Sequence, residues 1–357
     1  MLLHHYLNFI WLTKIIKFSW LVLVCIFLSG CDPFSRPDTM LDEYLERLSR
    51  VLEYQQTSID VVALDRLPSI KYRRYEIEPY TVNMLQFFSL YGCELQVLAG
   101  EKNSVLGKVM KPALRLDYEL RFITAAEKCI EQNKNGAELQ DTIQQVVMYK
   151  KAQLPKVLWN AIWTNDEITN YLSYSDGFYP LMNDLGHSTT SRKLSKLNKL
   201  IEQLLSQQYQ TDTTILNQLL YQWQYDASAG QLLKSTKVIT QYLKQANIIM
   251  AHRLKKPICY NNKSNPKAEI MEQFFFNIYI AKIQPYIAKT HQQTQIILPE
   301  LNKMANFIAA PSVEFKQYKQ QFSTAKLSTW GGFGKAIQQH TELWQSMLEQ
   351  CGMRPSP

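Results

Sequence analysis

Apolar residues recur every three or four positions along most of this chain, the spacing that one face of an α-helix requires. A first example is the set Leu41, Tyr44, Leu45, Leu48, Val51 and Leu52. Alternating apolar and polar runs are rare, and only one short strand is predicted, at Ile70–Tyr75. The pattern therefore predicts an all-α protein, a multi-helix bundle or array of roughly ten helices.

The same spacing places the helices within the chain. We predict them, in order, at 39–52, 80–98, 113–132, 137–163, 190–208, 212–227, 230–256, 267–283, 286–308, 312–325 and 334–351. Residues 80–98 are the most apolar of these, which is typical of a central helix. The stretch 55–79 lacks the helical period and should cross the molecule in extended form, and 99–112 is expected to be a loop.

Turn-forming residues gather at 166–190, where Asp176-Gly177, Pro180 and Gly186 interrupt the helical pattern. This irregular connection is the expected boundary between an N-terminal helical part, 39–165, and a C-terminal one, 191–357. The two parts are candidate helical subdomains.

The beginning of the chain has a different character. Lys14 and Lys17 precede Phe18–Leu28, which is apolar apart from Ser19, and no acidic residue occurs before it. An uncharged run of this length is shorter than the roughly 20 residues of a spanning helix. Basic residues, a short apolar run and small residues after it are typical of a secretory signal peptide, predicted here at residues 1–30.

The signal ends in Leu28-Ser29-Gly30-Cys31, which resembles the lipobox of bacterial lipoproteins. The resemblance implies cleavage before Cys31, a covalent lipid on its thiol and a body that faces the periplasm. In enteric lipoproteins an aspartate at the position of Asp32 marks retention in the inner membrane, so we expect the inner membrane, with the inner leaflet of the outer membrane as the alternative. Residues 31–38, which contain two prolines, are predicted to be a short tether.

The net charge of the chain indicates which classes of partner to expect. The net charge is +8, and loss of Lys14 and Lys17 with the signal leaves about +6 on the mature body. A basic body tethered by acyl chains is expected to lie near anionic lipid. Nucleic acid is not expected as a partner in the periplasm, no cofactor is expected besides the covalent lipid, and the sequence leaves the oligomeric state open.

Four cysteines remain once Cys25 is cleaved away and Cys31 is acylated. They are Cys93, Cys129, Cys259 and Cys351, and an even count in an oxidising compartment predicts two disulfides with three possible connectivities. We favour Cys93–Cys129 with Cys259–Cys351. A straight hairpin of helices 80–98 and 113–132 would nevertheless hold Cys93 and Cys129 about 15 Å apart, so the helices would have to cross.

A second resemblance rests on three stretches between residues 90 and 122. They are Leu90-Tyr91-Gly92-Cys93-Glu94-Leu95-Gln96, then Glu101-Lys102-Asn103-Ser104 with Leu106-Gly107-Lys108-Val109-Met110, and Tyr118-Glu119-Leu120-Arg121-Phe122. Together they resemble a family of uncharacterised predicted lipoproteins from gammaproteobacteria, a domain of unknown function. The resemblance covers about 37–130 well and the C-terminal half loosely, and it implies no catalytic residue.

Polar residues concentrate in the same region and form the candidate site: Glu94, Glu101, Asn103, Arg115 and Glu119. Paired carboxylates can serve acid/base chemistry. The simpler interpretation is that Arg115–Glu119 and Asp117–Arg121 are i,i+4 ion pairs on a helix surface. The isolated histidines have no metal-binding spacing.

Two functional hypotheses follow. The first is a membrane-anchored, periplasm-facing lipoprotein that acts without catalysis, as an interaction or assembly module for an envelope protein partner. The alternative is an envelope-acting enzyme or ligand-binding protein with a polar site near residues 94–121. A cleft at those residues would favour the alternative, and a filled core there would favour the first.

Overall fold

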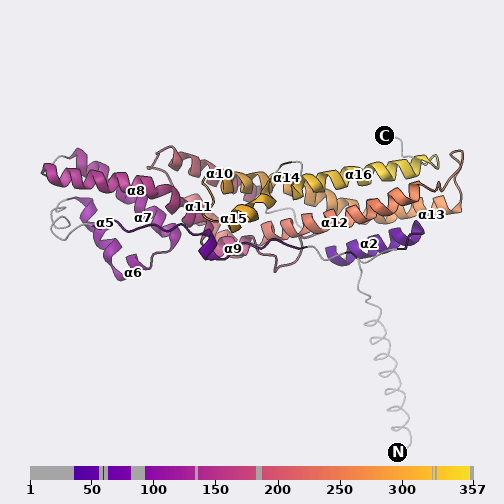
Figure 1. The fold of residues 1–357 in the computed structure, drawn as a ribbon, viewed down its shortest axis with the longest axis horizontal. Helices are drawn as coiled ribbons and strands as arrows, with labels where there is room; N and C mark the ends of the chain where they lie inside the picture. The colour runs from indigo at the N-terminus through magenta and orange to yellow at the C-terminus, as the bar shows by residue number, and fades with distance from the viewer. Residues whose placement is uncertain are drawn as a thin grey trace, which may run out of the picture.

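A computed structural model describes residues 36–55, 59, 63–81, 93–132, 136–181, 187–323, 325 and 328–353. These residues form an elongated array of helices (Figure 1). Tyr260 and Lys263 form an isolated β-bridge, and the described residues contain no strand. The predicted all-α array is confirmed. Cys31 and Asp32 lie outside the described residues, and no helix among the described ones is long and apolar enough to cross a membrane.

The first described helix is α2, Pro37–Val51. It begins inside the predicted tether, because proline at the start of a helix needs no hydrogen bond from its missing N–H. Its apolar face is buried against α12, Ser228–Leu254, and against the π-helix η1, Phe275–Ile283.

The strand predicted at Ile70–Tyr75 is wrong. Residues Ile70–Arg73 form a single helical turn, α3, within an otherwise extended segment. Arg73 is buried, and its guanidinium donates hydrogen bonds to Trp163 O (2.8 Å) and Thr169 Oγ1 (2.9 Å). It therefore satisfies a carbonyl at the C-terminal end of α8, where helix carbonyls lack partners and a cation is favoured.

Four described helices form the end of the array on the left of Figure 1, away from α2. They are α5, Glu94–Asn103; α6, Val105–Lys108; α7, Pro112–Glu131; and α8, Ala137–Trp163. The last two match their predictions, and α8 continues through Pro155. The predicted loop 99–112 is wrong, since α5 and α6 occupy most of it, while 82–92 of the predicted helix 80–98 lie outside the described residues.

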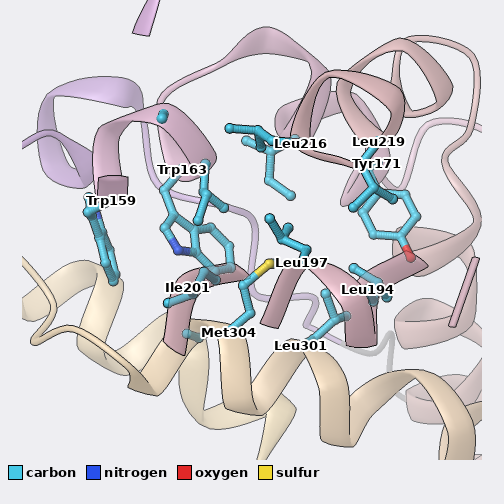
Figure 2. Packing of buried hydrophobic residues seen from close by; sticks show 14 of the residues in the cluster. Trp159, Trp163, Tyr171, Leu194, Leu197, Ile201, Leu216, Leu219, Leu301 and Met304 are labelled. Carbon is cyan, nitrogen blue, oxygen red and sulfur yellow. The ribbon is translucent and has the colours of Figure 1, made fainter. Parts of the chain in front are cut away.

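The middle of the molecule holds the largest hydrophobic cluster (Figure 2). The helices that contribute to it include α8, α9 (Asp166–Tyr171), α10 (His187–Leu205), α11 (Thr214–Trp223) and α14 (Gln284–Asn306). Figure 2 shows Trp163, Leu197, Ile201, Leu301 and Met304 converging between them. Helix α9 lies in the stretch predicted to be irregular, and the cluster contains residues from both sides of it.

The C-terminal half continues with six elements. After α12 come α13 (Pro266–Phe274), η1, α14, α15 (Val313–Tyr318), the 3₁₀-helix η2 (Lys319–Phe322) and α16 (Thr329–Glu349). The sequence predicts two separate helices here, at 267–283 and 286–308. The structure has one continuous run from Pro266 to Asn306, because η1 joins α13 to α14. Pro285 stands at the junction of η1 and α14, where the hydrogen-bonding pattern of the helix changes from π to α.

One side-chain network is buried between α2, α12 and α16. Nδ1 of His340 lies 2.7 Å from Asn247 Oδ1, and Nε2 lies 2.8 Å from the Tyr44 hydroxyl and 3.1 Å from Trp344 Nε1. An amide oxygen and an indole N–H have fixed roles, so Nδ1 carries the proton and donates it, while Nε2 accepts. The ring is neutral, and burial lowers the pKa of His340 to about 3.

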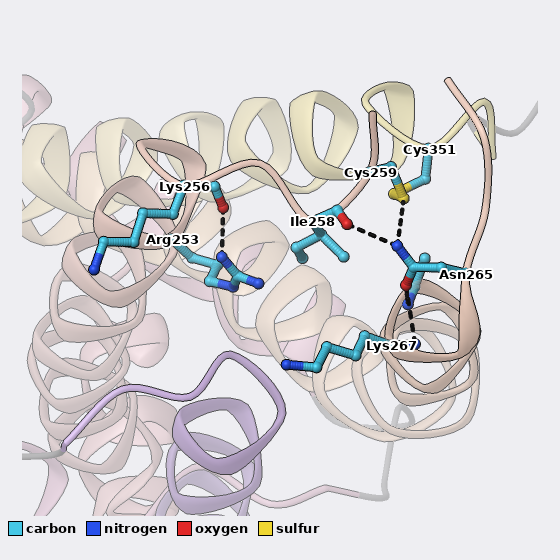
Figure 3. The surroundings of a disulfide bond; sticks show 8 residues. Arg253, Lys256, Ile258, Cys259, Asn265, Lys267 and Cys351 are labelled. Carbon is cyan, nitrogen blue, oxygen red and sulfur yellow. Dashed lines mark hydrogen bonds between the residues drawn. A yellow bond between two sulfur atoms is a disulfide. The ribbon is translucent and has the colours of Figure 1, made fainter. Parts of the chain in front are cut away.

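The far end of the array is closed by the disulfide Cys259–Cys351, whose Cα atoms are 5.1 Å apart (Figure 3). It joins the loop after α12 to the end of α16. Asn265 supports the loop, because its Nδ2 donates to Ile258 O at 2.7 Å while its Oδ1 accepts from Lys267 N and Ala268 N. Asn265 therefore caps α13 and at the same time holds the loop that carries Cys259 in place.

Candidate functional site

The second disulfide, Cys93–Cys129, sets the arrangement of α5 and α7. Its Cα atoms are 5.9 Å apart. Eight residues further along α5, Glu101 pairs with Arg121, which stands eight residues earlier in α7. The two helices therefore run antiparallel with Cys93 opposite Cys129. Both predicted pairings are confirmed, and the helices need not cross as the sequence suggested, because α5 begins just after Cys93 instead of ending near it.

A cavity of about 470 Å³ lies beside this helix pair. Its walls come from α5, α6, α7, α8 and the extended segment 77–81. The apolar part of the lining consists of Ile77, Pro79, Leu95, Ala99, Tyr118, Phe122, Leu139, Ile143 and Val146. The cations in the lining are Lys102, Lys108, Arg115 and Lys150. No acidic side chain of the described residues is among the lining residues.

Two of these cations, Arg115 and Lys150, contact the carboxylate of Glu119, which is 2% exposed. Its Oε1 accepts a hydrogen bond from Arg115 Nε, and its Oε2 accepts one from Lys150 Nζ at 2.5 Å. Two cations and one carboxylate leave this buried triad with a net positive charge. Since both carboxylate oxygens are engaged, Glu119 positions the two cations at the cavity wall and is not a free general base.

Lys150 reaches the triad from α8 across two aromatic rings. Its Nζ lies 4.4 Å from the centroid of the Phe122 ring and 5.2 Å from that of Tyr118, within the range of cation–π contacts. Burial lowers the pKa of Lys150, and the charge of Glu119 opposes that shift. Burial likewise lowers the pKa of Lys102, with the charge of Arg115 adding to the effect. Lys150 and Lys102 are thus held in surroundings of low polarity, where an anion gains more than it does in water, whereas Lys108 is exposed.

Three of the five predicted site residues lie at the cavity, and two lie away from it. Asn103 and Arg115 line the cavity, and Glu119 lies behind its wall. Glu94 is exposed in the first turn of α5, and Glu101 forms an exposed ion pair with Arg121 at 2.8 Å, so neither belongs to the site.

The interpretation of Arg115–Glu119 as a surface pair is wrong. The pair forms, but it is half-buried, because α8 packs over the carboxylate of Glu119 and brings in Lys150. Sequence reasoning also missed Lys102, Lys108 and Lys150. No local signal could have found Lys150, since its contact with Glu119 joins residues of two different helices.

The arrangement is suited to binding. Fixed cations beside an apolar wall can hold a molecule that has an anionic group and a nonpolar part. Among the described residues no group of three His, Cys, Asp or Glu side chains could hold a metal ion. A larger hollow of about 690 Å³ beside α15 carries charges of both signs, Asp65, Arg66 and Glu314, and lacks such an apolar wall.

A family model described as "Protein of unknown function (DUF3080)" matches residues 41–355. The chain belongs to the DUF3080 family. The match begins inside α2 and ends beyond α16, so the DUF3080 region includes the cavity and both disulfides. The resemblance to a family of unknown function is thus confirmed, and it extends over the C-terminal half as well. No curated protein and no solved structure matches this DUF3080 chain.

Proposed function

We propose that this chain is a lipid-anchored protein on the periplasmic face of the inner membrane that binds a small anionic amphiphile in the cavity. The anchor is supported by the resemblance of Leu28-Ser29-Gly30-Cys31 to a lipobox and by Asp32 after it. The cavity supports binding, the second of the two hypotheses that the sequence raised. The role assigned to the body is recognition without catalysis.

The observation that carries the proposal is the pairing of four cations with an apolar wall around one cavity. Cavities of about 300–1,000 Å³ are typical of small-ligand sites. A carboxylate or phosphate would find Lys102, Lys108 and Arg115 at the wall, and an alkyl chain would cover Leu95, Phe122 and Val146. A neutral or cationic amphiphile of the same length would gain only the apolar part of this binding energy.

Binding is measured by calorimetric titration of the full-length lipidated protein in nanodiscs of zwitterionic lipid. The probes are octyl phosphate, octanoate, octyltrimethylammonium and inorganic phosphate. We expect the two anionic octyl probes to bind in the cavity. The cationic probe lacks the electrostatic contribution and inorganic phosphate lacks the apolar one, so both should bind much more weakly.

Two variants locate the site. Lys108→Gln removes an exposed cation from the cavity lining and should weaken octyl phosphate binding about tenfold, the loss of one charge-assisted hydrogen bond. Ala99→Phe should occupy part of the cavity beside its apolar wall and weaken binding of the octyl probes. Lys128→Gln is the matched control, since Lys128 is exposed on α7 outside the lining. Equal binding of anionic and cationic octyl probes would exclude the proposed ligand class.

The anchor has its own test. Replacing Cys31 by alanine is expected to abolish incorporation of labelled palmitate in cells and to release the protein from the membrane fraction. Asp32→Ser should keep the lipid but move the protein from inner-membrane to outer-membrane fractions in a density gradient. Palmitate incorporation that persists in Cys31→Ala would contradict the assignment of Cys31.

A further inference from the structure

The turn around α6 presents an unusual group of exposed aliphatic side chains. Val105 and Leu106 are each 81% exposed, Val109 is 74% exposed and Leu114 is 57% exposed. These four residues are called the α6 surface below. Scattered exposed apolar residues are normal, but a group within ten positions of the chain is typical of an interaction site.

The α6 turn is held in place by its own contacts. The Ser104 hydroxyl accepts a hydrogen bond from Gly107 N at 3.0 Å, and Lys102 Nζ donates to Gly107 O at 2.8 Å. A Cβ at position 107 would come within 2.2 Å of Glu101 O, so only glycine allows α6 to pack this closely on the end of α5. The packing of Gly107 buries the backbone and turns the aliphatic side chains toward solvent.

The charges beside the α6 surface indicate the kind of partner. Lys108 and Lys111 are exposed next to it, and the nearby carboxylates of Glu101 and Asp117 both pair with Arg121. These five side chains together carry a net charge of +1. Aliphatic side chains flanked by lysines match the interface of an anionic bilayer, where acyl chains lie beneath negative headgroups.

The positions of α6 and α2 in the array also support an anionic membrane as the partner. In Figure 1, α6 and α2 both lie along the lower edge of the array. Arg36, just before α2, stands five residues after Cys31, and a chain of that length can place the Cα of Cys31 at most about 18 Å from it. We propose that the α6 surface inserts into the headgroup region of an anionic membrane as a second point of contact. This inference rests on the proposed anchor, and it brings the cavity beside the bilayer, because Lys108 belongs to both the turn and the cavity lining.

The test uses the full-length lipidated protein in vesicles of phosphatidylglycerol and phosphatidylcholine. An environment-sensitive fluorophore is attached at Leu106→Cys or, as a control, at Gln345→Cys, an exposed position on α16 along the opposite edge of the array. We expect a nitroxide carried by the lipids to quench the label at position 106 several-fold more than the label at 345. Adding Lys108→Gln and Lys111→Gln, or using phosphatidylcholine alone, should lower that quenching.

The outcomes separate this inference from the proposed anchor. Flotation of the wild type and of Cys31→Ser with vesicles of phosphatidylcholine alone, which lack anionic headgroups, reports on the anchor, whereas quenching at position 106 in the lipidated protein reports on the α6 surface. A label at 106 that is quenched by aqueous iodide and not by the lipid nitroxide overturns the inference even when flotation confirms the anchor. A protein crosslinked to position 106 in cells, with no lipid quenching, also overturns it and assigns the surface to a protein partner.

Discussion

Replacing Glu119 by alanine is expected to lower the free energy of unfolding by about 3 kcal/mol, near the lower end of what breaking a buried ion pair costs. The substitution removes the carboxylate that both Arg115 and Lys150 contact and leaves two cations beside an apolar wall. The loss is limited because Lys150, whose pKa burial already lowers, can release its proton. Urea unfolding followed by circular dichroism measures the change.

Glu101→Ala is the matched control for this prediction. Glu101 also pairs with an arginine of α7, but that pair is exposed and should contribute less than about 1 kcal/mol. The double variant Glu119→Leu, Lys150→Met should recover most of the lost stability, since replacing a buried pair by apolar residues is often close to neutral. An equal loss of unfolding free energy in Glu119→Ala and Glu101→Ala would show that burial of the triad does not increase its contribution to stability.

Acidification is expected to destabilise the protein through His340. Burial lowers the pKa of His340 to about 3 in the folded state, whereas an unfolded histidine titrates near about 6.5. Between these values the unfolded state binds more protons, so the free energy of unfolding rises with pH across that range. The contribution of the neutral ring is complete above about pH 6.5 and is lost by about 1.4 kcal/mol per pH unit below it, about 5 kcal/mol by pH 3.

The measurement is urea unfolding at a series of pH values from 7.5 to about 3.5 for the wild type and for His340→Gln. We expect the variant to be less stable at neutral pH, because Gln cannot reproduce all three hydrogen bonds. Its stability should depend less on pH below 6.5 than that of the wild type. His252→Gln, which replaces an exposed histidine, should keep the wild-type pH dependence, and a wild-type slope in His340→Gln would refute the assignment.

The order and the approximate course of most long helices could be predicted from sequence. Helices α7 and α8 follow directly from the helical spacing of their apolar residues, which is a local signal. The failures occur where distant residues decide the local structure. Residues 70–73 form a helical turn because the Arg73 side chain donates a hydrogen bond to a carbonyl at the end of α8. Helix α5 continues to Asn103 because one face of it packs on α7.

The disulfide pairing shows how one misplaced helix boundary affects a geometric argument. The sequence favoured Cys93–Cys129 although the predicted helix 80–98 held the two cysteines far apart. The structure resolves this conflict by beginning α5 at Glu94, which brings Cys93 opposite Cys129 in an antiparallel pair. Helix boundaries are the least certain part of a sequence prediction, so distances derived from them carry the same error.

The sequence by itself determined the all-α class, the course of most helices, the two cysteine pairs favoured and membership of a family of unknown function. Those features depend on periodicity and residue type, which are properties of neighbouring residues. Only the tertiary structure decided that Glu119 is buried, that Lys150 joins Arg115 at its side, and that four cations share one apolar cavity. The reason is physical: burial and charge pairing depend on which helices pack together, and the packing of α8 on α7 brings together residues 31 positions apart.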